Sequence, residues 1–253
     1  MKILFLGTGT SQGIPVIACD CLVCESDNSK DKRLRTSILF ETEGKVIVID
    51  SGPDFRQQML RENIKKLDAI LFTHQHKDHI AGLDDVRAFN YIQQKPMEVY
   101  ADQRVLRAVK NEFAYSFAED KYPGVPDINL HLIENQPFLI DNVQIIPIQV
   151  MHLKLPIFGF RIHDFVYITD ANFISEAEKD KMRNAKILVI NALRKKSHIS
   201  HFTLEQALQL IEEVKPEKAF LTHLSHQMGK HDEISCELPD NVQIAFDGLS
   251  VEW

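Results

Sequence analysis

The stretch Thr73-His74-Gln75-His76-Lys77-Asp78-His79 decides the fold, because four of the six positions from 74 to 79 carry metal-ligand side chains. It follows the apolar segment Ala69–Phe72 and precedes residues with helical spacing, so it stands at the end of a predicted strand. Loops at strand ends are where α/β folds place their chemistry. Desolvating three imidazoles without a partner is costly. The stretch therefore predicts a metal site in preference to a solvated polar loop.

Three further ligand residues stand at the ends of other predicted strands. His152 follows the strand 143–150, Asp170 ends the strand 165–169, and His223 ends the strand 218–222. A dinuclear site needs more ligands than the first stretch supplies, and these residues are the downstream candidates. Their spacing alone leaves open whether they converge.

The remaining pattern alternates strands with helices. Further strands are expected at 3–6, 37–40, 46–50, 69–73, 99–101, 129–133, 158–162, 186–191, 243–246 and 249–252. Helical spacing is found at 54–63, 79–91, 104–118, 175–184 and 203–214, with Thr203 and Gln206 as a capping box. Glu43-Gly44 is a hairpin signal. This predicts an α/β fold of two mixed sheets with helices outside, formed by a single domain over residues 1–253.

Composition is that of a soluble globular protein. The 253 residues are 44% hydrophobic and 26% charged, with a formal net charge of −7. This acidic balance argues against a nucleic-acid partner, which normally requires a basic face. No apolar run approaches the roughly 18 residues of a membrane span, and the N-terminal run Ile3–Leu6 is too short for a signal-peptide core. We therefore expect a cytoplasmic protein with no membrane partner.

The order of these motifs resembles the metallo-β-lactamase superfamily over essentially the whole chain. The carriers are H-x-H-x-D-H, then a single His, an Asp and a final His, with Asp50-Ser51-Gly52 before the first helix. The resemblance implies an αββα four-layer sandwich of two mixed sheets with helices on the outer faces. The ligands that it implies are His74, His76 and His152 for one metal, Asp78, His79 and His223 for the other, and Asp170 as the bridge.

Such a ligand set suits hydrolytic chemistry. Imidazole and carboxylate accept both Zn²⁺ and Mn²⁺, so the sequence does not choose between them. Two bound metals lower the pKa of water towards about 7 and stabilise the attacking and leaving oxygens. The centre would carry a formal charge of about +1, which attracts a small anionic phosphodiester despite the acidic chain. Superfamily members with di-iron redox chemistry typically carry Glu where this chain has His76, so hydrolysis is favoured.

A second constellation is the C-x-C-x-x-C spacing of Cys19, Cys21 and Cys24. In a reducing compartment such a cluster indicates metal ligands before disulfides. A tetrahedral structural Zn²⁺ needs one more ligand, and His226 is the candidate. The alternative is a set of buried cysteines without metal. The isolated Cys236 is expected to be a small buried hydrophobe.

The cysteine cluster and the opening segment Gly7–Pro15 resemble one subgroup, which includes the carbon–phosphorus lyase accessory phosphodiesterase. That enzyme opens phosphoribosyl cyclic phosphate, and its subgroup has a three-Cys, one-His zinc beside the active-site loops. The subgroup also has a catalytic His just before the helix that begins here near residue 203. His201 aligns best with it, and His198 is the second choice. Catalytic candidates are thus Asp78, His201 and His198.

The sequence therefore predicts a metal-dependent phosphodiesterase that hydrolyses a small cyclic or nucleotide-like substrate with a hydroxide held by two metals. A tRNA 3′-processing endonuclease is the nearest alternative, but the chain lacks an obvious basic, Gly-rich arm for RNA. A non-hydrolytic module of cofactor biosynthesis with the same fold is another alternative. The basic run Arg194–Lys196 fits either phosphate binding or a solvated loop. The family suggests a homodimer.

Overall fold

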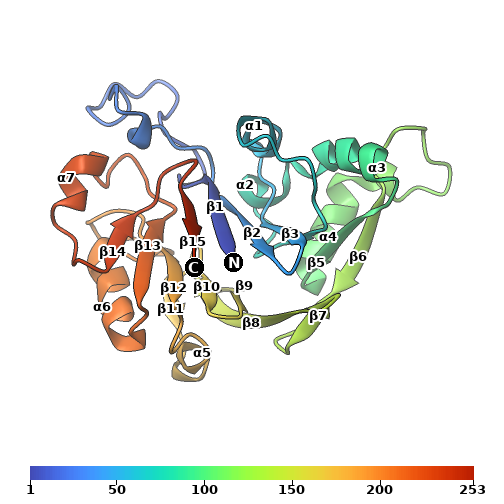
Figure 1. The fold of residues 1–253 in the computed structure, drawn as a ribbon. Helices are drawn as coiled ribbons and strands as arrows, with labels where there is room; N and C mark the ends of the chain where they lie inside the picture. Colours follow the sequence, from blue (N-terminus) through green and yellow to red (C-terminus); the bar gives the residue numbers. More distant parts are fainter. The chain divides into compact units, whose positions relative to one another are not determined.

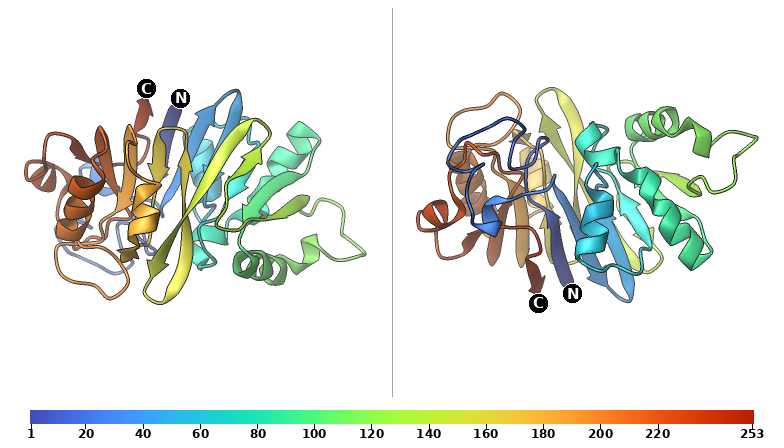
Figure 2. Two further views of the ribbon diagram at one scale, coloured as in Figure 1. Left: turned by 90° about the horizontal axis from the view of Figure 1, so that it is seen from below. Right: turned by 90° about the horizontal axis from the view of Figure 1, so that it is seen from above.

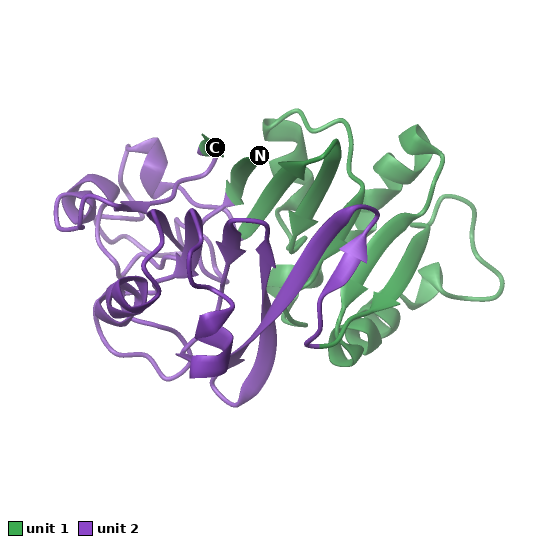
Figure 3. Cartoon of the chain, turned by 60° about the horizontal axis from the view of Figure 1, so that its bottom comes forward, with its two compact units in different colours: residues 1–6, 37–134, 250–253 green, residues 7–36, 135–249 purple.

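The computed structural model describes all 253 residues, which form two compact units. Unit 1 contains residues 1–6, 37–134 and 250–253, and unit 2 contains residues 7–36 and 135–249 (Figure 3). Each unit is built around one mixed β-sheet with helices, which confirms the predicted composition of the fold. The expectation of one domain over residues 1–253 stays a prediction.

Unit 1 contains a seven-stranded sheet in the order β15-β1-β2-β3-β4-β5-β6. The strands are β1 (Lys2–Gly7), β2 (Ser37–Thr42), β3 (Lys45–Ile49), β4 (Ala69–Leu71), β5 (Met97–Ala101), β6 (Ile128–Leu132) and β15 (Ser250–Glu252). Strands β2 and β3 form the expected antiparallel hairpin through Glu43 and Gly44, which both have positive φ. Strands β3 to β6 are parallel. Their carboxyl ends therefore meet at one edge of the sheet, where the loop of residues 72–76 begins.

The helices of unit 1 share a core with one face of this sheet (Figure 1). They are α1 (Phe55–Arg61), α2 (Lys77–Ile80), η2 (Leu83–Val86), α3 (Arg87–Gln93), α4 (Gln103–Glu112) and η3 (Ala114–Ser116). Phe55, Phe89 and Val105 from the helices lie in one buried cluster with Val48 and Val99 from the strands. Apolar burial of this kind stabilises the sheet by roughly 25 cal/mol per Å².

The predicted continuous helix over 79–91 is wrong. The chain forms α2, then η2, then α3, with a break at Gly82. A Cβ at Gly82 would lie 2.1 Å from the carbonyl oxygen of Gly52, so this position passes too close to another backbone for any side chain. Helical spacing in the sequence cannot reveal such a long-range contact.

Unit 2 contains an eight-stranded sheet in the order β11-β8-β9-β10-β12-β13-β14, with β7 paired to β8. The strands are β7 (Phe138–Ile140), β8 (Val143–His152), β9 (Leu155–Ile162), β10 (Phe165–Tyr167), β11 (Phe173–Ile174), β12 (Ile187–Asn191), β13 (Lys218–Thr222) and β14 (Val242–Ile244). Strands β10, β12, β13 and β14 are parallel, so their carboxyl ends also meet at one edge. Asn191 is the last residue of β12. His223 directly follows β13, and Asp170 comes three residues after β10.

The helices of unit 2 are η1 (Ser29–Asp31), α5 (Glu176–Asp180), α6 (Leu204–Val214) and α7 (His231–Ser235) (Figure 2). The predicted capping box is present at the start of α6, where Thr203 and Gln206 bond each other's backbone groups. Leu204, Leu210 and Val214 from α6 pack into the buried cluster of the unit 2 sheet. No helix in either unit has the length and apolar character needed to cross a bilayer.

Candidate metal centre

Unit 1 contributes four of the predicted ligands from the loop and first turn after β4. The ring nitrogens His74 Nε2 and His76 Nδ1 lie 3.0 Å apart, and His79 Nε2 lies 3.2 Å from Asp78 Oδ2. His74 and His79 are 1% exposed, with ring centroids 4.0 Å apart. Imidazole nitrogens and carboxylate oxygens that converge in this way form the donor set of a Zn²⁺ or Mn²⁺ site.

Asp50 orients one of these ligands, a role that the sequence pattern alone did not indicate. Its buried carboxylate accepts hydrogen bonds from His79 Nδ1 at 2.7 Å, Thr73 Oγ1 at 2.8 Å and Thr73 N at 2.9 Å. Burial raises the pKa of Asp50 above its usual value, and the hydrogen bonds from His79 and Thr73 offset only part of that increase. A proton on His79 Nδ1 leaves Nε2 as the ligand atom. An acidic residue directly after a buried apolar strand is the signal that could have identified Asp50.

Gly52 lets the segment after Asp50 pack directly on the start of α2. A Cβ at Gly52 would lie 2.0 Å from the carbonyl oxygen of Asp78. Ser51 N donates to His79 O at 2.8 Å, and Gly82 N donates to Ser51 O at 2.8 Å. The backbones around two candidate ligands are therefore held by a contact that tolerates no side chain.

Unit 2 contributes the other three predicted ligands from three strand ends. His223 Nε2 lies 3.1 Å from Asp170 Oδ1, and both residues have left-handed backbones with φ of 55° and 59°. His152 Nδ1 lies 2.8 Å from Asp170 O and 3.0 Å from Ser200 O. Carbonyl oxygens only accept, so His152 Nδ1 carries the proton and Nε2 is left for a metal. The order predicted from strand ends thus brings these ligands together within unit 2.

Both acid candidates lie beside these ligands. The buried ring of His201 stacks on His223 with centroids 4.8 Å apart, and His201 Nδ1 lies 3.8 Å from Asp170 Oδ1. Burial lowers the pKa of His201 to about 3, and His223 acts in the same direction, whereas Asp170 raises it. The His198 ring lies 5.1 Å from that of His201, and burial also lowers the pKa of His198. His201 is the one in contact with a ligand carboxylate.

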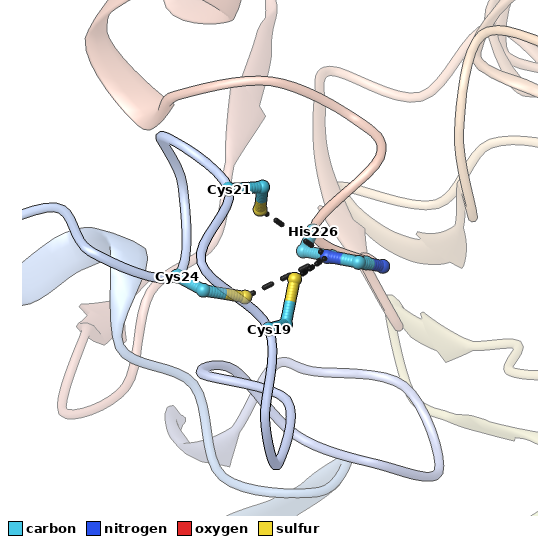
Figure 4. A group of neighbouring side chains, drawn as sticks. All are labelled: Cys19, Cys21, Cys24 and His226. Atoms are coloured by element: carbon cyan, nitrogen blue, oxygen red, sulfur yellow. Dashed lines mark hydrogen bonds between the residues drawn. The ribbon is translucent and has the colours of Figure 1, made fainter.

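Cys19, Cys21, Cys24 and His226 form a second cluster within unit 2 (Figure 4). Their sulfur atoms lie 3.2, 3.3 and 3.6 Å from His226 Nδ1. A tetrahedral Zn²⁺ with Zn–S of about 2.3 Å and Zn–N of about 2.0 Å separates S from N by about 3.5 Å, so the four atoms fit this ion. The backbone N–H of Cys24 lowers the pKa of Cys21 to about 6, whereas burial raises the pKa of Cys24 to about 11. A bound Zn²⁺ would deprotonate coordinating thiols outright.

Neighbouring segments that looked chemically suggestive have structural roles. Gly9 N donates to Leu34 O at 2.8 Å in a backbone bridge, which agrees with a structural role for the glycine-rich opening. Arg194 donates to Ser197 O and to Gln227 Oε1, so its guanidinium holds its own loop. The expectation for Cys236 is wrong, because this cysteine is exposed at the end of the short helix α7.

Comparison with known proteins shows the family to which this chain belongs. A model described as "Beta-lactamase superfamily domain" matches residues 45–224. A crystal structure of a new diphosphatase from the PhnP family is 38% identical, with a TM-score of 0.93 over 100% of this chain and 97% of that one. The chain belongs to the PhnP family. This PhnP-family chain has the metallo-β-lactamase fold, as predicted.

Other relatives of this PhnP-family chain are more distant or only partly matched. Zn²⁺-bound PqqB from Methylobacterium extorquens, 17% identical with a TM-score of 0.80 over 100% of both chains, shares the fold. Human tRNase Z, short form, 18% identical with a TM-score of 0.73 over 100% of this chain and 99% of that one, also shares it. An octanoyltransferase from Porphyromonas gingivalis is 40% identical over 252 residues. That match covers 98% of this chain and 51% of the relative, so the chain spans about half of that protein's length.

Proposed function

We propose that this PhnP-family protein is a phosphodiesterase that hydrolyses a small cyclic or nucleotide-like phosphodiester of the phosphoribosyl cyclic phosphate type. The observation that carries the proposal is the full set of ligand residues at strand ends in a chain 38% identical to a PhnP-family diphosphatase. A module of this fold that only binds, and does not hydrolyse, would not need the complete set of residues that hold two metals. This favours hydrolysis over a non-hydrolytic role in cofactor biosynthesis.

The family pattern assigns the ligands to two divalent metals, Zn²⁺ or Mn²⁺. We propose His74, His76 and His152 for one, Asp78, His79 and His223 for the other, and Asp170 as the bridge. When bound, such metals lower the pKa of water and neutralise charge that develops on phosphate oxygens. The chain's own contribution is orientation, since Asp50 fixes the ring of His79, and two carbonyl groups fix the ring of His152.

His201 is proposed to supply a proton or a hydrogen bond to the leaving oxygen. Burial keeps the ring neutral in the free protein, because it lowers the pKa to about 3. An anionic phosphate beside the ring would raise that pKa by Coulomb attraction, which favours the protonated ring when substrate is bound. His198, the second candidate, has its ring centroid 5.1 Å from that of His201 and retains the alternative role.

A structural Zn²⁺ held by Cys19, Cys21, Cys24 and His226 completes the proposal. His226 stands three residues after the metal-ligand candidate His223. A closed four-ligand site has no open position for substrate, so its contribution is to hold the segment that follows β13. The proposed total is two catalytic metals and one structural metal.

A phosphoanhydride is the second candidate substrate, because the PhnP-family neighbour is described as a diphosphatase. The attacked phosphorus and the metal requirement are the same, and only the leaving group differs. A precursor tRNA is less favoured, since the net charge is −7 and the human tRNase Z comparison shows the fold alone. The proposal also carries the expectation of a homodimer.

The deciding experiment measures hydrolysis of bis-p-nitrophenyl phosphate, a ribose cyclic phosphate, a nucleoside diphosphate and a precursor tRNA, each with Zn²⁺ or Mn²⁺. Turnover of the cyclic phosphate, abolished in His76→Ala, supports the proposal. Turnover of the diphosphate alone selects the second candidate. No turnover of any phosphodiester by the fully metallated protein overturns the proposal.

A further inference from the structure

The segment that carries His201 has no regular secondary structure, and hydrogen bonds along its length, such as Leu193 N to Phe202 O at 3.0 Å, hold it in position. It runs from residue 192 to residue 203, between β12 and α6. Phe202 N donates to Ala171 O at 2.8 Å, and His152 Nδ1 donates to Ser200 O at 3.0 Å. These bonds connect the segment to the metal-ligand candidate His152 and to Ala171, which directly follows the candidate Asp170. We call residues 192–203 the acid loop.

Asn191, the last residue of β12, clamps the backbone to which the acid loop is attached. Its buried Oδ1 accepts from Ala171 N at 2.8 Å, and its Nδ2 donates to Ala171 O at 2.9 Å. Asp170, three residues after the end of β10, has a φ of 59°, so the backbone turns there. An asparagine amide offers one acceptor and one donor, as a peptide group does. The Asn191 amide therefore pairs with both backbone groups of Ala171, as the peptide groups of a neighbouring strand would.

Asn172 makes a second connection, on the other side of the same segment. Its Oδ1 accepts from Leu153 N at 2.7 Å, and its Nδ2 donates to Ile199 O at 3.3 Å. Leu153 directly follows the ligand candidate His152, and Ile199 lies in the acid loop. One partly exposed side chain thus bridges the turn after β8 and the acid loop.

We infer that Asn191 and Asn172 are positioning residues that hold His201 in its place beside Asp170 and His152. The inference rests on the proposed function, in which His201 assists the leaving group. Neither asparagine contacts the reacting atoms in this scheme. The side chains of His223 and Asp170 contact each other without either amide, so we expect loss of the amides to loosen the acid loop more than this ligand pair.

The test compares two esters that differ in their need for an acid. A p-nitrophenolate group leaves without protonation, whereas the alkoxide of a ribose cyclic phosphate needs a proton. We expect Asn172→Ala, Asn191→Ser and Asn191→Leu to lower kcat for the cyclic phosphate by about 30-fold or more and for bis-p-nitrophenyl phosphate by less than about 3-fold. His201→Ala should show the same split.

Asn90 provides a matched control in unit 1. Its Oδ1 accepts from Asp127 N at 3.0 Å, and its Nδ2 donates to Asp127 O at 2.9 Å, so it makes the same pair of hydrogen bonds to the backbone of one residue as Asn191 does. Asn90→Leu should leave the ratio of the two activities unchanged. A readout that needs no activity is tryptic cleavage after Lys195 and Lys196, which are exposed in the acid loop. Cleavage should be faster in Asn172→Ala than in Asn90→Leu.

Equal losses on both esters, or wild-type activity and cleavage in Asn172→Ala, overturn the inference. If the Asn191 variants do not fold, the partly exposed Asn172 carries the test. A wild-type protein that hydrolyses neither ester overturns the proposed function instead. The tryptic comparison still decides in that case whether the amides hold the acid loop.

Discussion

At the scale of single residues, backbone conformation marks the candidate site. Asp50, Asp170 and His223 each end or follow a strand with φ between 55° and 66°. Asp and His tolerate this left-handed region better than most residues, but it still costs of order 1 kcal/mol or more. The cost persists where surrounding contacts fix the residue, as three hydrogen bonds do for Asp50. The same turn aims each side chain away from its sheet, towards the ligand cluster of its own unit.

Asp50→Asn should weaken metal binding by about 10- to 100-fold, the usual cost of losing a carboxylate partner of a ligating histidine. The amide keeps the size of the side chain but no longer fixes the proton on His79 Nδ1. Competition with a chelator measures the affinity. Asp68→Asn is the control, because the buried Asp68 pairs with Lys66 and Lys95 away from the ligands. Equal affinities in wild type and Asp50→Asn would contradict the assigned role.

At the scale of elements, the parallel strands of each sheet bring ligand-bearing loops to one edge. This holds for β3 and β4 in unit 1 and for β10, β12 and β13 in unit 2. Glycine contacts and the cysteine cluster then fix the loops. The interactions that position ligands are therefore mostly backbone contacts between loops, and they can be tested element by element.

Gly52→Ala should disturb the start of α2, since its Cβ would lie 2.0 Å from Asp78 O. Backbone cannot move aside as a flexible side chain can, so we expect a loss of about 1–3 kcal/mol in stability together with weaker metal binding. Gly124→Ala is the comparison, because nothing lies within 4 Å of its added Cβ but its φ of 92° is strained for alanine, so it should lower stability without changing metal affinity. Denaturant unfolding and metal titration of both variants give the comparison. An unchanged metal affinity in Gly52→Ala would contradict the role of this contact.

Cys21→Ser should remove one Zn²⁺ per chain and lower the melting temperature by roughly 5 °C or more, because structural zinc contributes folding energy directly. Metal analysis of the wild type should give about three metals, and the variant about two. Cys236→Ser removes an exposed cysteine outside the cluster and should change neither value. A variant that retains all its zinc would show that the four residues do not form the site.

Sequence patterns predicted the elements that are long or locally encoded. The capping box of α6 and the hairpin at Glu43 were correct because neighbouring residues determine both. Strands β7 and β11 and helix α7 were missed, since two to five residues show no period. Likewise the cluster at 74–79 was visible as a motif. Asn191 was not, because its bonds to Ala171 join residues 20 positions apart.

At the scale of the whole molecule, charge and ligand supply have to be considered together. The chain carries −7 formally, yet the proposed metals make its reaction centre cationic. On the proposed assignment unit 1 supplies four ligand residues and unit 2 supplies three. We therefore expect activity to require that each unit is folded. Conditions that destabilise either one should reduce hydrolysis, and acidic pH is one such condition for unit 2.

The acid sensitivity of unit 2 should depend partly on His231. Arg33, 5% exposed, donates to Thr8 Oγ1 at 2.7 Å, to Ala245 O at 2.6 Å and to His231 Nδ1 at 3.3 Å. An arginine can only donate, so His231 Nδ1 accepts and the ring is neutral. Burial and the Arg33 charge lower the pKa of His231 in the folded protein. The unfolded chain therefore binds this proton first.

Because the folded pKa of His231 is below the unfolded value of about 6.5, stability is complete above that pH and declines as the pH falls below it. His231→Asn cannot be protonated, so its melting temperature should fall less than that of wild type between pH 7.5 and 5.5. His163→Asn, at an exposed position, controls for the loss of one histidine. Parallel curves for wild type and His231→Asn would show that this ring does not make unit 2 acid-sensitive.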